Sequence, residues 1–376
     1  MTLAPTLSLY VARHFLSAAL LMLGALTGLV ALFDFIELLR RTANRPEVTI
    51  DVPLAIAALR LPFVAIQIMP FALLLGGILA FWRLTRSSEL IVARAAGISA
   101  WGFLTGPILV ALTLGVTATL GLSPLSSTLL ARAERMDQTF LRSGGGLSAL
   151  AGGRLWLRQG DRGLDPAGVA ILAGRPQAAP AGAAPGSAPF ALHEVTVWRL
   201  SAADRPLERI EAPHARLNNG AWELTQAVAF GEDRVPRPLG AFRLPTDLTA
   251  GTIEDSFANP ETLGFWSLPG FIDVLEQAGF SAVRHRIQFH SLLALPVLAV
   301  DMALLAAGFS MRQTRRGGVG QMIAAGIAAG FALFVIDRVS TEFGESGSLP
   351  VLLAAWAPAV AGLLLALALL LHLEDG

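Results

Sequence analysis

The chain has 376 residues, of which 54% are hydrophobic, and its 28 basic and 28 acidic residues cancel to a formal net charge of zero. Soluble proteins average about 45–50% apolar residues even with glycine counted, so this composition predicts an integral membrane protein. The absence of cysteine excludes thiolate metal sites and thiol nucleophiles. Because lysine is also absent, the chain cannot form a Walker A loop, and its neutral charge balance argues against nucleic-acid binding.

Apolar runs occur in the first and last parts of the chain, three in each. A helix needs about 20 apolar residues to cross a bilayer, so each run predicts one transmembrane helix. The first run is too long for the core of a signal peptide and is expected to be retained. The runs cover residues 10–39, 52–82, 100–130, 287–311, 319–339 and 349–371.

The section between the third and fourth runs has short alternating segments separated by Gly, Pro, Asn and Asp. Asn218-Asn219-Gly220 separates two such segments as a hairpin turn would, which predicts an inserted all-β domain. Within it, Gly174 to Pro189 is Ala/Pro/Gly-rich and is expected to be a long disordered loop, and Phe271 to Gln277 an amphipathic helix. The predicted domains are residues 1–142, 143–277 and 278–376.

Arginines in short loops indicate which side of the membrane is cytoplasmic. Two basic loops fit an internal N-terminus, with the arginines Arg83, Arg86, Arg94, Arg312, Arg315 and Arg316. The loop of residues 40–51 would then be periplasmic although it holds Arg40, Arg41 and Arg45. On balance we expect both termini in the cytoplasm and the β domain in the periplasm.

The loop between the second and third runs, residues 86–99, is predicted to form a short helix parallel to the membrane. Ser87 can cap its start, Glu89 suits the first turn, and Gly97 can end it. Its small, apolar surface fits either an interfacial helix on lipid or a docking helix for another protein. In a multispan chain without a Walker motif, docking to a separate ATPase is favoured.

Four features resemble the LptF/LptG permease family: the first-span ending Asp34 to Arg41, the Ser88 to Gly97 loop, the central β domain, and Phe334 to Asp337 in the fifth span. The similarity covers nearly the whole chain and is weakest in the β domain. The acidic first-span ending and the Gly344 to Pro350 segment resemble the LptG branch more than the LptF branch.

The resemblance implies a permease subunit of an ABC transporter that extracts lipopolysaccharide from the inner membrane of a Gram-negative bacterium. It implies six transmembrane helices with a periplasmic β-jellyroll, an LptF-like permease partner, two copies of an LptB-like ATPase and an LptC-like single-span protein. This chain would bind no cofactor and no metal and have no catalytic residue, since ATP and Mg belong to the partner ATPase.

The resemblance also assigns residues to roles. The ATPase-coupling set is Ser88, Glu89, Leu90, Arg94 and Gly97. The substrate-binding set is Glu37, Arg40, Arg41, Arg132 and Arg135. Guanidinium groups bind phosphate bidentately, so arginines at the level of lipid A phosphates suit this substrate, although single boundary arginines more often reach to lipid headgroups.

Asp34 departs from the family pattern, because enterobacterial relatives tend to carry a lysine at this position. An acid would repel phosphate, so a substrate contact is not carried over to it. Two explanations stay open: Asp34 pairs with a neighbouring arginine, or the lipid A bound here carries a different charge.

Charged groups within membrane spans are costly and point to function. Asp301 and Asp337 could form the pair of an intramembrane protease, but at about 1.5 Å per residue their depths differ by roughly 10 Å, too far to share a proton. Asp337 with Arg338 is instead expected to form an ion pair at a periplasmic gate. His285 and His290 are expected to be structural rather than metal ligands.

A different function class is a non-transporting membrane anchor or assembly factor whose β domain binds partners. The loop around Glu89 distinguishes the two, because an anchor needs no helix for docking an ATPase.

Overall fold

The computed structural model describes residues 5–43, 48–95, 99–140, 148–151, 154–161, 168–176, 190–201, 205–218, 220–231, 233–246, 248, 259–277, 281–310 and 319–374. The chain divides into two compact units. A helical unit combines residues 1–141, 260–268 and 283–376, and a strand unit combines residues 142–259 and 269–282.

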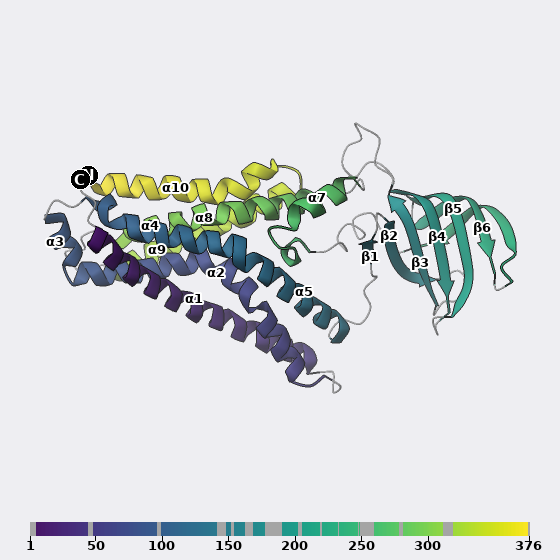
Figure 1. The fold of residues 1–376 in the computed structure, drawn as a ribbon, viewed down its shortest axis with the longest axis horizontal. Coiled ribbons are helices and arrows are strands. Elements are labelled where there is room, and N and C mark those ends of the chain that lie inside the picture. The colour runs from purple at the N-terminus through teal and green to yellow at the C-terminus, as the bar shows by residue number, and fades with distance from the viewer. Residues whose placement is uncertain are drawn as a thin grey trace. The chain divides into compact units, whose positions relative to one another are not determined.

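The helical unit contains six helices that are long and apolar enough to cross a membrane, which confirms the predicted spans (Figure 1). The third span is built from two helices joined by a π-helical turn, η1. The elements are α1 (Pro5–Thr42), α2 (Asp51–Arg86), α3 (Glu89–Ala95), α4 (Ala100–Thr117), η1 (Ala118–Leu122), α5 (Ser123–Phe140), the 3-10 turn η2 (Pro260–Thr262), α8 (Val283–Ser310), α9 (Val319–Glu345) and α10 (Val351–Glu374).

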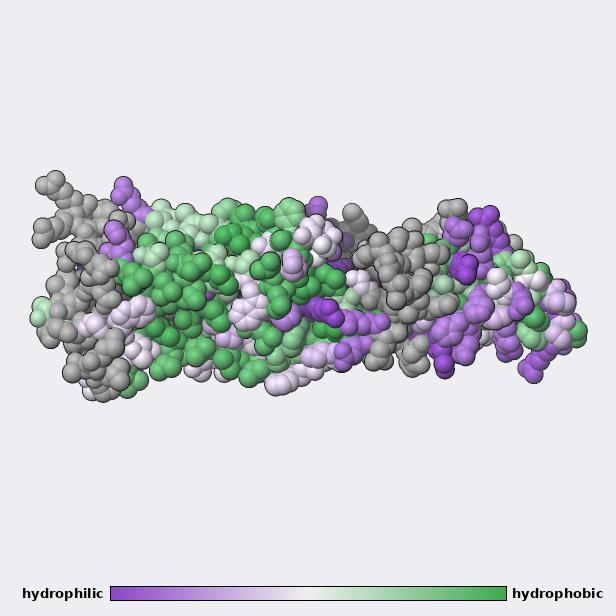
Figure 2. Space-filling view, turned by 90° about the horizontal axis from the view of Figure 1, so that it is seen from above, coloured by the Kyte–Doolittle hydropathy of each residue, from purple (hydrophilic) through white to green (hydrophobic). Residues whose placement is uncertain are grey.

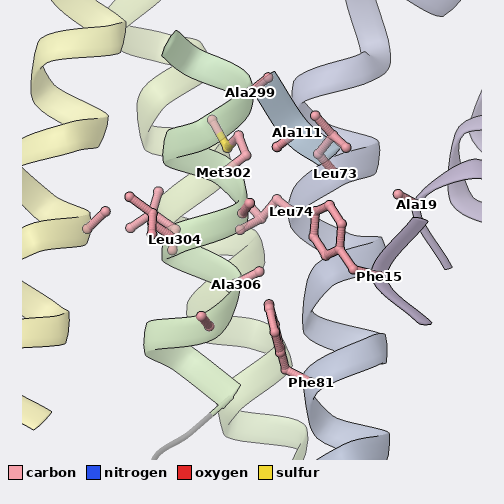
Figure 3. Close-up of a cluster of buried hydrophobic side chains, with 14 of the residues drawn as sticks. Phe15, Ala19, Leu73, Leu74, Phe81, Ala111, Ala299, Met302, Leu304 and Ala306 are labelled. Atoms are coloured by element: carbon pink, nitrogen blue, oxygen red, sulfur yellow. The ribbon is translucent and has the colours of Figure 1, made fainter. Parts of the chain in front are cut away.

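Helix α8 lies at the centre of this unit, and 67% of its most apolar 18-residue stretch is buried, more than in any other span. Figure 3 shows Met302 of α8 on the side that faces Leu74 of α2, with Phe15 of α1 beside Leu74. Small side chains such as Ala306 fill the remaining contacts, as is usual where membrane helices approach closely.

The outer surface of the helical unit is largely apolar (Figure 2). Large apolar side chains point outward from α1 and α9, including Leu21, Phe33, Phe331 and Phe343. In a soluble protein such a surface would have to be covered. Its extent agrees with a lipid environment or partner helices around the spans.

The strand unit is one antiparallel sheet of seven described strands. The strands are β1 (Ser148–Ala151), β2 (Arg154–Asp161), β3 (Gly168–Pro176), β4 (Ala191–Leu200), β5 (Pro206–Asn218), β6 (Ala221–Phe230) and β7 (Pro236–Pro245). The expected hairpin is confirmed: Asn218 pairs with Ala221, and Gly220 has φ +73°, which glycine adopts without strain. The prediction of an all-β insertion is therefore confirmed.

Two details of the insertion differ from expectation. A jelly roll places non-consecutive strands side by side, but each described strand pairs with its neighbours in sequence, so the observed order is a meander. Residues Gly174 to Pro176 belong to β3 instead of a disordered loop, because they pair with β4. The rest of the expected loop, residues 177–189, lies outside the described residues.

One face of the sheet is buried and apolar, with Leu155, Leu172, Val197 and Trp222 almost fully covered. A buried ion pair lies between strands, where Arg199 donates from Nε and Nη2 to Asp161 at 2.6 and 2.8 Å. Burial alone would lower the pKa of Arg199, but hydrogen bonds and charges from Asp161 and Glu208 outweigh it and raise the pKa. The pair therefore stays charged at physiological pH.

Helix α7 (Leu268–Gln277) contains the amphipathic segment predicted at residues 271–277, which is confirmed. Leu268, Ile272 and Leu275 are buried, at one-turn spacing, while Val274 is exposed.

Candidate coupling and substrate sites

The predicted docking helix is observed as α3, a seven-residue helix between two spans. It leaves α2 at Ser88, whose φ of +61° is uncommon for a residue with a side chain. Ala93 is buried, while the side chain of Val92 is 65% exposed. Of the predicted coupling residues, Gly97 lies outside the described residues, as do the side chains of Leu90 and Arg94.

Glu89 is held by contacts within this chain. The Ser87 hydroxyl donates to its carboxylate at 2.8 Å, and a hydrogen bond also joins it to the hydroxyl of Tyr10 on α1. The Ser87 hydroxyl is also within hydrogen-bond distance of the Leu84 carbonyl, at 3.2 Å, and its expected role as a helix cap stays a prediction. Glu89 thus links α3 to α1.

The C-terminal end of α1 carries the first part of the predicted substrate set. Arg40 donates to both carboxylate oxygens of Glu37 at 2.8 and 2.9 Å, and Arg41 donates to Glu37 at 2.9 Å. The side chains of Arg40 and Arg41 are 76% and 48% exposed. A carboxylate does not bind phosphate, so Glu37 orients the two arginines and cancels one of their charges.

Asp34 lies one turn before Glu37 and pairs with Arg60 of α2 at 3.0 Å. Both side chains are mostly covered, at 26% and 22% exposure. Of the two explanations left open by the sequence, pairing with an arginine is the one observed. Arg60 was missed in the sequence reading, although it is the only charged residue between residues 52 and 82.

Arg132 and Arg135 lie on α5 and are both exposed. Between them in sequence, Ala133 is buried against Leu38 of α1 and Ile56 of α2. This small cluster brings the end of α1, the start of α2 and α5 together at one end of the helical unit. The structure thus brings the four predicted substrate arginines onto neighbouring helices, while Arg45 lies outside the described residues.

The remaining intramembrane acids do not pair. Asp301 is fully buried, and neither carboxylate oxygen has a hydrogen-bond partner among the described residues. It lies against Gly362 of α10, beside Leu333 of α9. No ion pair within 4.0 Å joins Asp337 and Arg338 among the described residues, and the role of these α9 residues at a periplasmic gate stays a prediction.

Among the described residues, no group of three His, Asp or Glu side chains could hold a metal ion. His285 is buried at the start of α8, and the nearby Arg284 pairs with Glu345 of α9 at 3.6 Å. These contacts join the ends of two spans.

Comparison with known proteins decides the family. The model of the lipopolysaccharide export system permease LptF/LptG family matches residues 9–372. The chain belongs to the LptF/LptG permease family. It is 23% identical to the lipopolysaccharide export system permease protein LptG of Haemophilus influenzae over 366 residues, covering 94% of this chain and 95% of that protein. It is 24% identical to LptG of Escherichia coli K12 over 127 residues, covering 34% and 35% of the two chains.

As an LptF/LptG permease, the chain is a multi-pass inner-membrane protein and a transporter component, not itself an enzyme. The resemblance expected from the sequence is confirmed. The helical unit has two distinct ends. One end, made by α1, α2 and α5, carries the arginines, and the other carries α3.

Proposed function

We propose that this chain is the LptG-type permease subunit of an ABC transporter that extracts lipopolysaccharide from the inner membrane and passes it to a periplasmic bridge. Its partners are an LptF-like permease, two copies of an LptB-like ATPase, which bind ATP and Mg, and an LptC-like single-span protein. Both termini and α3 lie in the cytoplasm, and the strand unit lies in the periplasm.

The observation that carries this proposal is the short helix α3, which connects two spans and exposes Val92. A short helix that joins two spans and presents an apolar side chain offers a surface on which another protein can dock. No observation favours a non-transporting anchor, which would not require such a helix.

Substrate binding is assigned to the arginines of α1 and α5. Arg40 and Arg41 are held ready by Glu37, and Arg132 and Arg135 project from the neighbouring helix. Planar guanidinium groups bind the phosphates of lipid A bidentately. The charge of Asp34 is balanced by Arg60, so it need not repel an anionic lipid.

Val92→Glu tests docking more cleanly than reversal of Glu89, because Glu89 also bonds to Ser87 and Tyr10. The chain is coexpressed with the ATPase and the LptF-like permease, and complex formation and ATP hydrolysis are measured. We expect Val92→Glu to lower ATPase copurification at least tenfold, since it places a charge in an apolar contact.

Val235→Glu is the matched control, because Val235 is also exposed, at 53%, but belongs to the strand unit. It should leave ATPase binding unchanged. Full assembly and hydrolysis with Val92→Glu would contradict the docking role of α3.

A further inference from the structure

Several spans contain prolines, and two of these prolines, Pro124 and Pro296, lie close to the π-helical turn η1 and each leave a backbone carbonyl without its helical partner. In an α-helix the carbonyl of residue i accepts from the N–H of residue i+4, and proline has no N–H. Pro124 therefore removes the helical N–H donor to the carbonyl of Leu120, which lies in the π-helical turn η1. Pro296 removes the donor to the carbonyl of Leu292 in α8. Unpaired carbonyls are costly in apolar surroundings, so each needs another donor.

Both carbonyls receive a donor from a side chain of another segment. The indole Nε1 of Trp266 donates to the Leu120 carbonyl at 3.2 Å. The hydroxyl of Thr119, within η1, donates to the Leu292 carbonyl at 2.8 Å. The carbonyls of Leu120 and Leu292 are thus both bonded across the fold.

Further contacts join the same segments around these two carbonyls. The backbone N–H of Phe265 donates to the hydroxyl of Ser123 at 3.3 Å, and the Phe265 ring stacks on Phe289 of α8 at 5.3 Å. Gly115 of α4 lies so close to Pro296 that an added Cβ would be 2.5 Å from the proline Cα. Three segments, α4–η1–α5, α8 and residues 260–268, therefore meet at one joint.

The joint lies directly before α5, which carries Arg132 and Arg135. A π-helical turn carries one extra residue per turn, so the direction of the following helix depends on which carbonyls are bonded. Leu120 and Thr119 both belong to that turn.

We propose that Thr119 and Trp266 are positioning residues that fix the direction of α5 and so place Arg132 and Arg135 at the same end of the helical unit as Arg40 and Arg41. The inference rests on the proposed function for the role of these arginines. It adds that the two hydrogen bonds at the joint determine where the α5 arginines meet the substrate. These bonds are needed because Pro124 and Pro296 remove the helical donors.

The test measures the direction of the third span in the assembled transporter, with cysteine-free partner subunits. Because this chain lacks cysteine, spin labels can be attached to Leu109→Cys and Thr128→Cys, exposed positions on either side of η1. Pulsed electron paramagnetic resonance then gives their distance distribution. We expect Trp266→Phe, which keeps the ring and removes the donor, to shift or broaden this distribution by several ångströms.

Pro124→Ala restores an N–H four residues after Leu120, so Trp266→Phe on that background should cause no further change. Thr119→Val, tested with Pro296→Ala, examines the second bond independently. The control is Trp356→Phe, because the Trp356 indole makes no hydrogen bond within the described residues. If Trp266→Phe and Thr119→Val both match this control, the joint does not position α5 and the inference is overturned.

Lipopolysaccharide crosslinking to the same variants separates the inference from the proposed function. A changed distance with reduced crosslinking supports both. An unchanged distance, while Arg132→Ala still abolishes crosslinking, overturns the inference alone. A changed distance, while Arg132→Ala and Arg135→Ala have no effect on crosslinking, overturns the substrate role of these arginines.

Discussion

At the scale of single residues, acids near the end of α1 control how much positive charge is offered to a ligand. Glu37 accepts from both Arg40 and Arg41, so the three side chains carry one net positive charge instead of two. Asp34 cancels the charge of Arg60 in the same region. The number of arginines alone therefore overstates the attraction for a phosphorylated lipid.

Glu37→Gln should increase the affinity for lipid A severalfold and steepen its dependence on salt, because one more positive charge becomes available to phosphate. Binding is measured in detergent at several salt concentrations. Glu211→Gln, which removes the partner of Arg209 in the strand unit, serves as the control. An affinity and salt slope equal to those of the control would refute the role given to Glu37.

Arg60→Leu should destabilise the helical unit by about 1–3 kcal/mol, less than the loss for a fully buried pair, because Asp34 keeps a mostly covered charge without a partner. Thermal unfolding in detergent provides the measurement. The double variant Asp34→Leu with Arg60→Leu should recover most of the loss. If the double variant is less stable than Arg60→Leu, the pair is not the source of the effect.

At the scale of elements, the angle between α2 and α3 depends on one backbone conformation. Ser88 has φ +61° at the junction, and the first backbone bond of α3 runs from the Val92 N–H to the Ser88 carbonyl. The backbone conformation of Ser88 therefore sets the direction of α3, and this role does not depend on what its hydroxyl contacts.

Ser88→Gly should preserve ATPase binding, since glycine adopts positive φ freely, whereas Ser88→Val should weaken it through about 1–3 kcal/mol of backbone strain. Copurification of the ATPase with each variant checks this. Ser87→Val is the comparison, because Ser87 has an ordinary φ of −75°. Equal binding by Ser88→Val and Ser88→Gly would show that the backbone conformation does not matter for docking.

At the scale of the whole molecule, the proposed topology follows from the order of elements, because one membrane span separates α3 from the inserted sheet along the chain. The loop arginines support this orientation only weakly, because Arg40 and Arg41 count against it. Their pairing with Glu37 does not remove that conflict, because the rule counts basic residues and acids contribute little to it.

Single cysteines test the orientation directly in a chain that has none. Thr225→Cys, exposed on β6, should react with a membrane-impermeant maleimide in spheroplasts, whereas Ala95→Cys on α3 should react only after lysis. The opposite pattern would place the strand unit in the cytoplasm and invert the proposed topology.

Local patterns predicted some features well and failed for others. The Asn218 to Gly220 turn was recognised because turn chemistry depends on adjacent residues. The expected loop from Gly174 was partly wrong, since Gly174 to Pro176 extend β3, and the pairing partners of these residues are distant in sequence. The substrate roles of Glu37 and the four arginines stay predictions, and the structure adds that Glu37 pairs with both Arg40 and Arg41.

The sequence by itself determined the number and length of the spans, the inserted sheet and the lack of an ATP site, because hydrophobic run length, alternation and residue absence are properties of the linear chain. Only the tertiary structure decided the partner of Asp34 and the donors for Leu120 and Leu292. Thr119 and Leu292 are 173 residues apart. Such pairs exist only once helices pack, since packing determines which distant side chain reaches an unpaired charge or carbonyl.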